Sequence, residues 1–146
     1  MVVAIIAIIA AIAIPNLLAA KRASNEIGAV AALKSISTSQ RLFRESDAEG
    51  DGEFDYGTLA ELATAGVIDD ILGTGTRSGY QFESDAGFNN RFFVFWAVGN
   101  PRQFGRTGDR SFATNHQGVI FYTTEIFNTA TVESDALLPD GMLQLR

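Results

Sequence analysis

Cysteine is absent from this chain of 146 residues, and histidine occurs once, as His116. Without cysteine the chain has no disulfides, no thiolate metal ligands and no cysteine nucleophile. A single histidine excludes metal sites that are built on several histidines. His116 lies in a turn-forming sequence with no acidic or nucleophilic neighbour, so it gives no indication of a catalytic triad. The sequence therefore predicts a protein that is not an enzyme.

Basic residues are also scarce in this chain. It carries 11 Lys and Arg against 17 Asp and Glu, which gives a net charge of −6. Binding to nucleic acid without sequence preference depends on clustered positive charge that displaces phosphate counterions. We therefore expect no nucleic-acid partner.

Charge is missing altogether from the first 20 residues, MVVAIIAIIAAIAIPNLLAA, in which only Pro15 and Asn16 depart from apolar character. A helix of about 20 apolar residues spans the roughly 30 Å hydrocarbon core of a bilayer. A cleaved secretory signal has a basic start and a shorter apolar run of about 7–15 residues. The apolar run in this chain is longer than that of a secretory signal and has no basic start. Residues 1–22 are therefore predicted to form a helix that can span a membrane.

The helical pattern continues beyond the apolar run, because residues 23–44 contain only Gly28 as a helix-weakening residue. The apolar side chains of this stretch recur every three residues, at Ile27, Val30, Leu33 and Ile36. We predict one rod over residues 1–44, about 66 Å long, with an amphipathic second half. Proline lacks an N–H and clashes with the preceding turn, so Pro15 predicts a kink or a local opening of the backbone just before it.

The string MVVAIIAIIAAIAIPNLLAAKRASNE, residues 1–26, resembles the N-terminal helix of type IV pilins and of the related pseudopilins. In that family an apolar helix with proline at this place is followed by a polar turn rich in small residues. Mature chains of the family begin with an N-methylated aromatic residue, followed within a few positions by Glu, after removal of a short basic leader. Met1 corresponds to a position a few residues inside that mature helix. Leader cleavage by a prepilin peptidase and N-methylation are therefore implied by the resemblance alone.

The resemblance implies the structural subunit of an extracellular type IV pilus, with adhesion or motility as its role. The precursor is expected in the inner membrane, and the assembly machinery then polymerises it into a helical homopolymer at the cell surface. The residues expected to bury one another in that polymer are Val2, Val3, Ile5, Ile6, Ile8, Ile9, Ile12, Ile14, Pro15, Leu17 and Leu18. Lys21 and Arg22 follow the apolar run, so the positive-inside rule places the remaining chain in the cytoplasm. The family keeps its amino terminus inside, and we follow the family.

Two other functions remain open at this point. A pseudopilin of a type II secretion or DNA-uptake system has the same helix but forms a short periplasmic filament. A single-span, membrane-anchored binding or enzymatic domain needs a cluster of functional side chains within residues 45–146. The sequence shows no such cluster.

Residues 45–70 form an acidic block that contains nine acids and no base. Within it acids stand at every second position from 47 to 55, with Gly50 and Gly52 among the residues between them, which resembles the first nine places of a calcium loop. The candidate ligands are Asp47, Glu49, Asp51 and Asp55. The pattern then fails, because a threonine occupies the place of the bidentate Glu and the next Glu comes three residues late. Calcium is the one cofactor that the sequence suggests, and a solvated acidic loop is the simpler interpretation.

The remaining pattern predicts an α+β protein of pilin-like architecture, in which the long helix packs on a small antiparallel sheet of about four strands. The capping-box sequence from Thr58 to Glu61 predicts a short helix over residues 58–65. The predicted strands are residues 79–83, 91–98, 110–114 and 119–123. The strand over residues 91–98 is apolar on both faces, so one face can pack on the helix and the other must be covered by loops or by a neighbouring subunit.

The C-terminal segment, residues 128–146, is predicted to lie over the sheet. Its candidate anchors are Leu137, Leu138, Met142, Leu143 and Leu145. Residues 100–110 are predicted to form a loop. Its three arginines, Arg102, Arg106 and Arg110, are suited to bind a phosphate or a carboxylate. We expect a subunit contact there, in which the acidic segment 45–55 of a neighbouring subunit meets these arginines.

Overall fold

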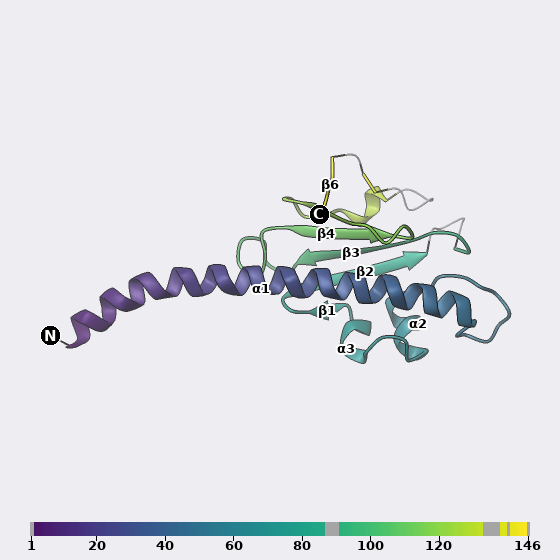
Figure 1. Ribbon diagram of the computed structural model, residues 1–146, viewed down its shortest axis with the longest axis horizontal. Coiled ribbons are helices and arrows are strands. Elements are labelled where there is room, and N and C mark those ends of the chain that lie inside the picture. Colours follow the sequence, from purple (N-terminus) through teal and green to yellow (C-terminus); the bar gives the residue numbers. More distant parts are fainter. Residues whose placement is uncertain (1, 87–90, 133–137, 140, 146) are drawn as a thin grey trace.

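The computed structural model describes residues 2–86, 91–132, 138–139 and 141–145. Its dominant element is the helix α1, Val2–Ser46. The C-terminal half of α1 packs against a sheet and a short helix, and its N-terminal half projects away from them (Figure 1). The molecule is therefore a rod with a head at one end.

Pro15 lies within α1, and the helix continues through it without interruption. The predicted local opening of the backbone before Pro15 is therefore wrong. The N-terminal part of α1 instead curves away from the straight axis of the remaining helix (Figure 1). Curvature moves the proline ring away from the carbonyl of the preceding turn, so the helix loses one hydrogen bond without breaking.

Within the described residues, six antiparallel strands form one sheet in the order β1-β2-β3-β4-β5-β6. The strands are β1 Thr76–Arg77, β2 Tyr80–Ala86, β3 Phe95–Pro101, β4 Ser111–Asn115, β5 Ile120–Thr123 and β6 Leu143–Gln144. The helices of the head are α2 Leu59–Thr64, α3 Asp70–Gly73 and the 3₁₀ turn η1 Thr129–Thr131. The four predicted strands are β2 to β5, which confirms the α+β class. The two extra strands are edge pairs of two residues each, too short to show a pattern in the sequence.

The aromatic strand is displaced from its predicted position. Phe92 and Phe93 lie in a turn with 40 % and 65 % of their surface exposed, and β3 begins at Phe95. The carbonyl of Arg91 accepts a hydrogen bond from the Tyr56 N–H at 3.0 Å. This segment is therefore held to the acidic loop instead of to β2.

The main core lies between α1 and one face of the sheet. Leu33, Ile36 and Phe43 of α1 are buried there against Phe82 and Phe112. The helix also presents buried Ala29 and Ala32, whose small side chains bring its backbone close to the sheet. The arrangement of a long apolar N-terminal helix on an antiparallel sheet is compatible with a pilin-like fold.

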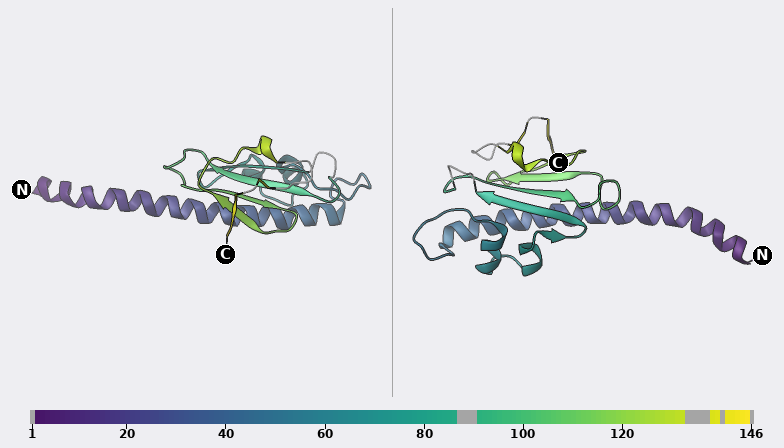
Figure 2. Two further views of the ribbon diagram at one scale, coloured as in Figure 1. Left: turned by 90° about the horizontal axis from the view of Figure 1, so that it is seen from above. Right: turned by 180° about the vertical axis from the view of Figure 1, so that it is seen from behind.

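A second core covers the opposite face of the sheet. Trp96, Val98 and Phe127 are buried there, and Leu138 and Met142 pack on them. The prediction that β3 needs a cover on its second face, and that the C-terminal segment supplies it, is confirmed by these contacts (Figures 1 and 2).

The other C-terminal anchors behave differently. Leu145 packs against the main core, and Leu143 has 59 % of its surface exposed. Leu137 lies outside the described residues.

The local signals around α2 are confirmed. The Thr58 hydroxyl accepts from the Glu61 N–H, and the Glu61 carboxylate accepts from the Thr58 N–H, so the predicted capping box is complete. Gly66 follows the helix with φ +72°, a conformation that favours glycine. The hairpin between β4 and β5 also forms, with the Gly118 N–H donating to the Asn115 carbonyl at 2.8 Å.

Candidate functional site

The apolar half of α1 is the first candidate for a functional surface. Its large side chains are between 54 % and 80 % exposed, from Leu18 to Val3. No residue in the most apolar stretch of α1 is buried within the molecule, and the helix is long and apolar enough to cross a membrane. An exposed apolar surface of this extent is unfavourable in water, so it marks a surface that contacts lipid or protein.

The second half of α1 buries a different set of residues from the one predicted. Leu33 and Ile36 are buried, but Ile27 has 71 % of its surface exposed. A spacing of three residues drifts around a helix of 3.6 residues per turn, so Ile27 faces away from the sheet. Glu26 occupies the buried position instead, at 7 % exposure. Ile27 extends the exposed apolar surface beyond the apolar half of α1.

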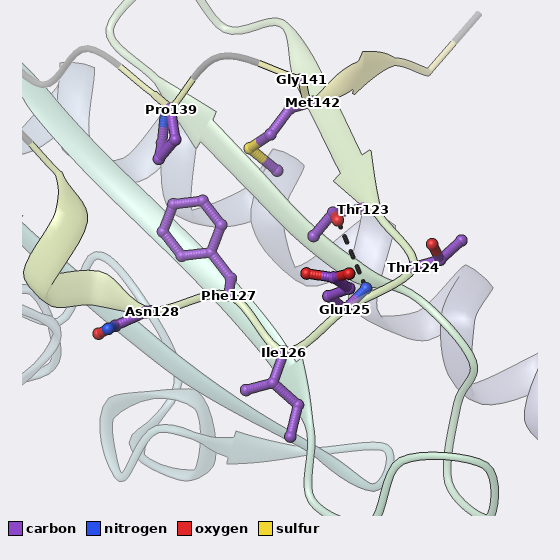
Figure 3. A pocket seen from close by; sticks show the side chains of 9 residues that line it. All are labelled: Thr123, Thr124, Glu125, Ile126, Phe127, Asn128, Pro139, Gly141 and Met142. Carbon is purple, nitrogen blue, oxygen red and sulfur yellow. Dashed lines mark hydrogen bonds between the residues drawn. The ribbon is translucent and has the colours of Figure 1, made fainter.

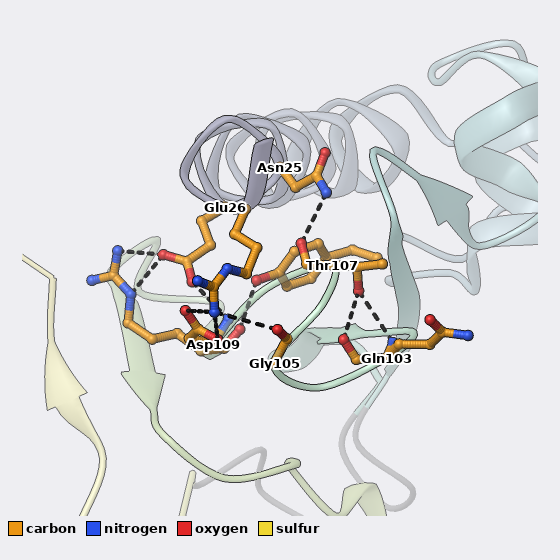
Figure 4. Close-up of polar contacts among 9 residues, drawn as sticks. Asn25, Glu26, Gln103, Gly105, Thr107 and Asp109 are labelled. Atoms are coloured by element: carbon orange, nitrogen blue, oxygen red, sulfur yellow. Dashed lines mark hydrogen bonds and ion pairs between the residues drawn. The ribbon is translucent and has the colours of Figure 1, made fainter. Parts of the chain in front are cut away.

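Glu26 is the centre of a polar cluster that fastens α1 to the loop between β3 and β4 (Figure 4). Its Oε2 accepts from Nε and Nη2 of Arg110 at 2.8 and 2.6 Å, and its Oε1 accepts from the Asp109 N–H at 2.9 Å. Both carboxylate oxygens thus have partners, as a buried charge requires.

Two neighbours of Glu26 on α1 extend this cluster. Arg22 donates to Asp109 at 3.0 Å and to the carbonyl of Gly105 at 3.3 Å. The Asn25 amide donates to the Thr107 carbonyl at 2.9 Å. The loop is therefore bound to α1 just after the apolar half of the helix ends (Figure 4).

Tyr80 lies beneath this cluster, and its hydroxyl donates to the Arg110 carbonyl at 2.8 Å. Burial, and then the nearby Glu26 carboxylate, raise the pKa of Tyr80 well above its ordinary value. Tyr80 thus keeps its proton and remains a donor in this contact.

Sequence reasoning missed Glu26 and Arg22 as contact residues. Their partners lie 83 to 87 positions away in the chain, a separation that no local spacing reveals. The only local signal was the presence of an acid on the predicted amphipathic helix.

The three arginines of the loop do not act together. Arg110 binds Glu26 within the chain, and its guanidinium also lies 5.5 Å from the centre of the Phe112 ring. Arg102 and Arg106 are exposed. The structure therefore places Arg110 in an internal contact, and it leaves Arg102 and Arg106 on the surface.

The acidic loop, residues 47–57, is organised by its own backbone. Asp47 Oδ2 accepts from the Gly52 N–H at 3.1 Å, and Asp51 Oδ1 accepts from the Glu53 N–H at 2.9 Å. Asp55 is buried at 1 % exposure and pairs with Arg91 Nε at 2.5 Å. Among the described residues no three acidic or histidine side chains come together as a set that could hold a metal ion. The four calcium candidates are therefore not gathered at one point.

Glu49 remains an exposed acid of this loop. Desolvation, followed by the negative charges of Glu61, Asp55 and Asp51, raises the pKa of Glu49 above its ordinary value. This surface of the head therefore carries concentrated negative charge.

Two shallow grooves lie along the C-terminal segment. One, of about 370 Å³, is lined by residues 123–128 and by Pro139, Gly141 and Met142. In Figure 3 the Phe127 ring points toward Pro139 and Met142, whereas Ile126 points away from them. The second groove, of about 480 Å³, runs past Arg102. Among the described residues that line the first groove, Glu125 is the one titratable group.

Comparisons of this chain with models of protein families, with curated proteins and with solved structures found no match.

Proposed function

We propose that this chain is the structural subunit of a type IV pilus filament, which polymerises through the apolar half of α1. The observation that carries the proposal is the exposure of residues 2–20 on a helix that continues without a break into the head. A buried core helix does not leave such a surface open, and a bare membrane anchor does not need a rigid continuation into the head. The resemblance of residues 1–26 to pilins supports the same function.

Assembly exchanges one apolar environment for another. In the precursor the large side chains of residues 2–20 contact lipid in the inner membrane. In the filament the same side chains contact the helices of neighbouring subunits, which exclude water equally well. Subunits displaced along a common axis make head-to-tail contacts that do not close, and such contacts generate a helical polymer.

Charge on the head provides a second contact between subunits in this proposal. The acidic loop lies beyond the C-terminal end of α1, whereas Arg102 and Arg106 follow β3 beside the start of the packed half of α1. These opposite charges are thus at opposite ends of the head, where a subunit displaced along the axis brings them together. Arg110 contributes less, because Glu26 already neutralises it.

The family resemblance supplies the remaining parts of the proposal. The precursor is processed by a prepilin peptidase, handled by the pilus assembly machinery in the inner membrane, and displayed at the cell surface as a homopolymer. Adhesion and motility are the roles that the resemblance implies. A pseudopilin uses the same helix, and it differs in forming a short filament that stays below the surface.

The substitution Ile8→Asp tests the proposal, because Ile8 is 64 % exposed in the apolar half of α1. A buried carboxylate there disfavours both lipid and helix packing, so filaments sheared from the source cells should be lost. Ile71→Asp is the matched control, since Ile71 is 67 % exposed on α3 of the head. Filaments should persist in that variant.

Electron cryo-microscopy of the wild-type filaments should show density for residues 2–20 at the filament axis. Filaments that survive Ile8→Asp contradict the proposed contact. Wild-type chain that is found only in the inner-membrane fraction contradicts the surface pilus, and it favours a pseudopilin or a single-span anchored domain.

A further inference from the structure

One end of the head faces the projecting half of α1, and we call it the proximal end. It comprises the loop of residues 102–110 between β3 and β4 and the segment of residues 124–126 after β5. Pro101 pairs with Tyr80, and Ser111 pairs with Thr123, so β2, β3, β4 and β5 all begin or end on the same side of the sheet. Figures 1 and 2 show this edge turned toward the N-terminus of the molecule.

The level of the proximal end relative to a membrane follows from the helix. Residues 2–20 at a rise of 1.5 Å per residue cover about 28 Å, close to the thickness of the hydrocarbon core. Arg22 and Asn25 come directly afterward and bind the loop through Gly105 and Thr107. When residues 2–20 span a bilayer, the loop therefore lies at the level of the lipid headgroups.

The proximal end carries positive charge that the chain itself does not neutralise. Arg22 pairs with Asp109, and Arg110 pairs with Glu26. In the described part of the chain, the exposed side chains of Lys21, Arg102 and Arg106 have no ion pair.

Two exposed acids lie close to these cations. Glu125 belongs to the proximal end itself, and Glu83 of β2 lines the same groove as Arg102. Glu83 pairs with Val98, three positions before the end of β3, so it lies within the sheet and not at the strand ends that form the proximal end. Arg102, Arg106 and the adjoining Lys21 of α1 outnumber Glu125, so the proximal end together with this turn of α1 carries net positive charge.

Apolar side chains stand among these cations. Phe104 is 42 % exposed between Arg102 and Arg106, and Ile126 is 64 % exposed. Arg102 and Ile126 line the same groove, so they are neighbours in space. Exposed aromatic and aliphatic side chains interleaved with arginine are the composition of surfaces that lie in the interfacial zone of a membrane.

The loop is held in place before any partner binds. The N–H groups of Arg106 and Thr107 donate to the Gln103 carbonyl at 3.0 and 2.9 Å, and the Gln103 N–H donates to the Thr107 hydroxyl at 3.1 Å. The contacts from α1 fix this turn to the helix. Its exposed side chains are thus presented in a preorganised arrangement, which lowers the entropic cost of binding a surface.

We propose that the proximal end of the head docks on the bilayer surface and that Arg102, Arg106 and Lys21 bind anionic phospholipid headgroups while Phe104 and Ile126 enter the interfacial zone. The inference rests on the membrane stage of the proposed function. It adds a second membrane contact, which sets the tilt of the head on the precursor. Charge complementarity and the level of the loop favour lipid as the occupant in the membrane-inserted precursor, before assembly brings the acidic loop of a neighbouring subunit to these arginines. The chain's own acidic loop cannot take that place, because it lies roughly 36 Å farther along α1.

The absence of native cysteine allows a direct test. The variant Gln103→Cys carries one environment-sensitive fluorophore on an exposed side chain of the loop. The labelled full chain is reconstituted into vesicles of phosphatidylcholine and into vesicles of phosphatidylcholine with phosphatidylglycerol. Both vesicle types are prepared with a nitroxide near the lipid headgroup, which reports on position 103, and separately with a nitroxide in the acyl chain, which reports on position 9. Ile9→Cys reports insertion of α1, and Glu53→Cys in the acidic loop reports a part of the head that is remote from the membrane.

We expect the fluorophore at position 103 to be quenched strongly in the vesicles that contain phosphatidylglycerol and weakly in pure phosphatidylcholine. Each cation near an anionic surface strengthens binding by about fivefold, so the reversal R102E/R106E should lower the docked fraction by tenfold or more. The fluorophore at position 53 should stay unquenched in every vesicle. Arg102 and Arg106 make no side-chain contacts that the described fold requires, and near-ultraviolet circular dichroism of Trp96 checks that the variant is folded.

Each other outcome overturns the inference in a distinct way. If the fluorophore at position 9 is quenched and the one at position 103 is not, the docking is wrong while membrane insertion stands. If neither is quenched, the membrane stage of the proposed function fails as well. If position 103 is shielded only in assembled filaments, the occupant of the proximal end is a neighbouring subunit instead of lipid.

Discussion

Glu26 sits on the buried face of α1, where a carboxylate needs partners for both oxygens. Arg110 and the Asp109 N–H supply them from a loop more than 80 positions away. Removing one partner of such a contact leaves the other charge buried without a partner, which lowers the free energy of unfolding. A solvent-exposed ion pair contributes little to that free energy. Individual buried polar side chains therefore determine how the helix is seated on the sheet.

The substitution Glu26→Gln should lower the free energy of unfolding by about 1–2 kcal/mol. The amide keeps the shape but has only one accepting oxygen, so it cannot accept from both Arg110 and the Asp109 N–H. The 38 % exposure of the Arg110 side chain limits the loss. Urea unfolding of the full chain in detergent micelles, followed by near-ultraviolet circular dichroism, measures this change in the free energy of unfolding. Glu83→Gln on the exposed side of β2 should be neutral. Equal stability of the two variants contradicts the role given to Glu26.

Asp69 predicts a pH dependence of stability. The Leu72 N–H, followed by Arg77, lowers the pKa of Asp69 below its ordinary value of 3.8. A folded-state pKa below that of the unfolded chain stabilises the fold above the unfolded pKa, and this contribution disappears as pH falls through the folded value. Asp69→Asn should therefore melt below wild type at neutral pH, and the gap should close in acid below about pH 4. Asp70→Asn, one residue later, should show a smaller gap, and a gap independent of pH contradicts this explanation.

At the scale of elements, Gln40 connects three parts of the head. Its Nε2 donates to the Gly57 carbonyl at 2.5 Å and to Ser84 Oγ at 3.0 Å, and its Oε1 accepts from the Gly57 N–H at 3.1 Å. The residue is fully buried on α1. One amide thus joins the helix, the loop before α2 and strand β2.

Gln40→Leu should cost about 2 kcal/mol of unfolding free energy, because both backbone groups of Gly57 lose their partners in a buried site. The leucine preserves most of the side-chain volume, so packing changes little. Gln81→Leu, at an exposed position on β2, is the matched control. Thermal melts of the two variants in micelles provide the comparison, and a Gln40→Leu melt equal to the control contradicts the bridging role.

Pro15 determines the shape of α1 and predicts a change in geometry. Replacing it with alanine restores one helical hydrogen bond and removes the ring, which favours a straight helix by about 3 kcal/mol. Spin labels at Ala4→Cys and Ala19→Cys lie on either side of Pro15. Because the sequence contains no cysteine of its own, the labels attach only at these two positions. Their separation should be longer and more narrowly distributed in Pro15→Ala. An unchanged distribution shows that the curvature has another cause.

At the scale of the whole molecule, a head with two cores is joined to a rod that has none. The head buries both faces of its sheet, one under α1 and one under the C-terminal segment. The projecting half of α1 buries nothing within the molecule. The head is thus packed within the molecule, whereas the projecting half of α1 needs an apolar environment from outside the molecule.

The chain should therefore associate when detergent is removed and stay monomeric in micelles. Sedimentation velocity measures both states. Ile5→Asn with Ile9→Asn places two amides on one face of the apolar half and should reduce association, because each amide must leave water without a partner. Ile71→Asn, equally exposed on α3, should not change it. Association that is unaffected by the double substitution places the contact elsewhere.

Sequence alone determined what depends on neighbouring residues: the uninterrupted apolar run, the capping box at Thr58 and the existence of the four main strands, because each is set by residue types within a few positions. The start of β3 and the contact of Glu26 with Arg110 were decided only by tertiary structure. Each of these depends on which distant segments meet. Glu26 and its partners lie more than 80 positions apart, so no local sequence pattern predicts their contact. The contact is seen only in the folded chain, where the sheet brings the two segments together.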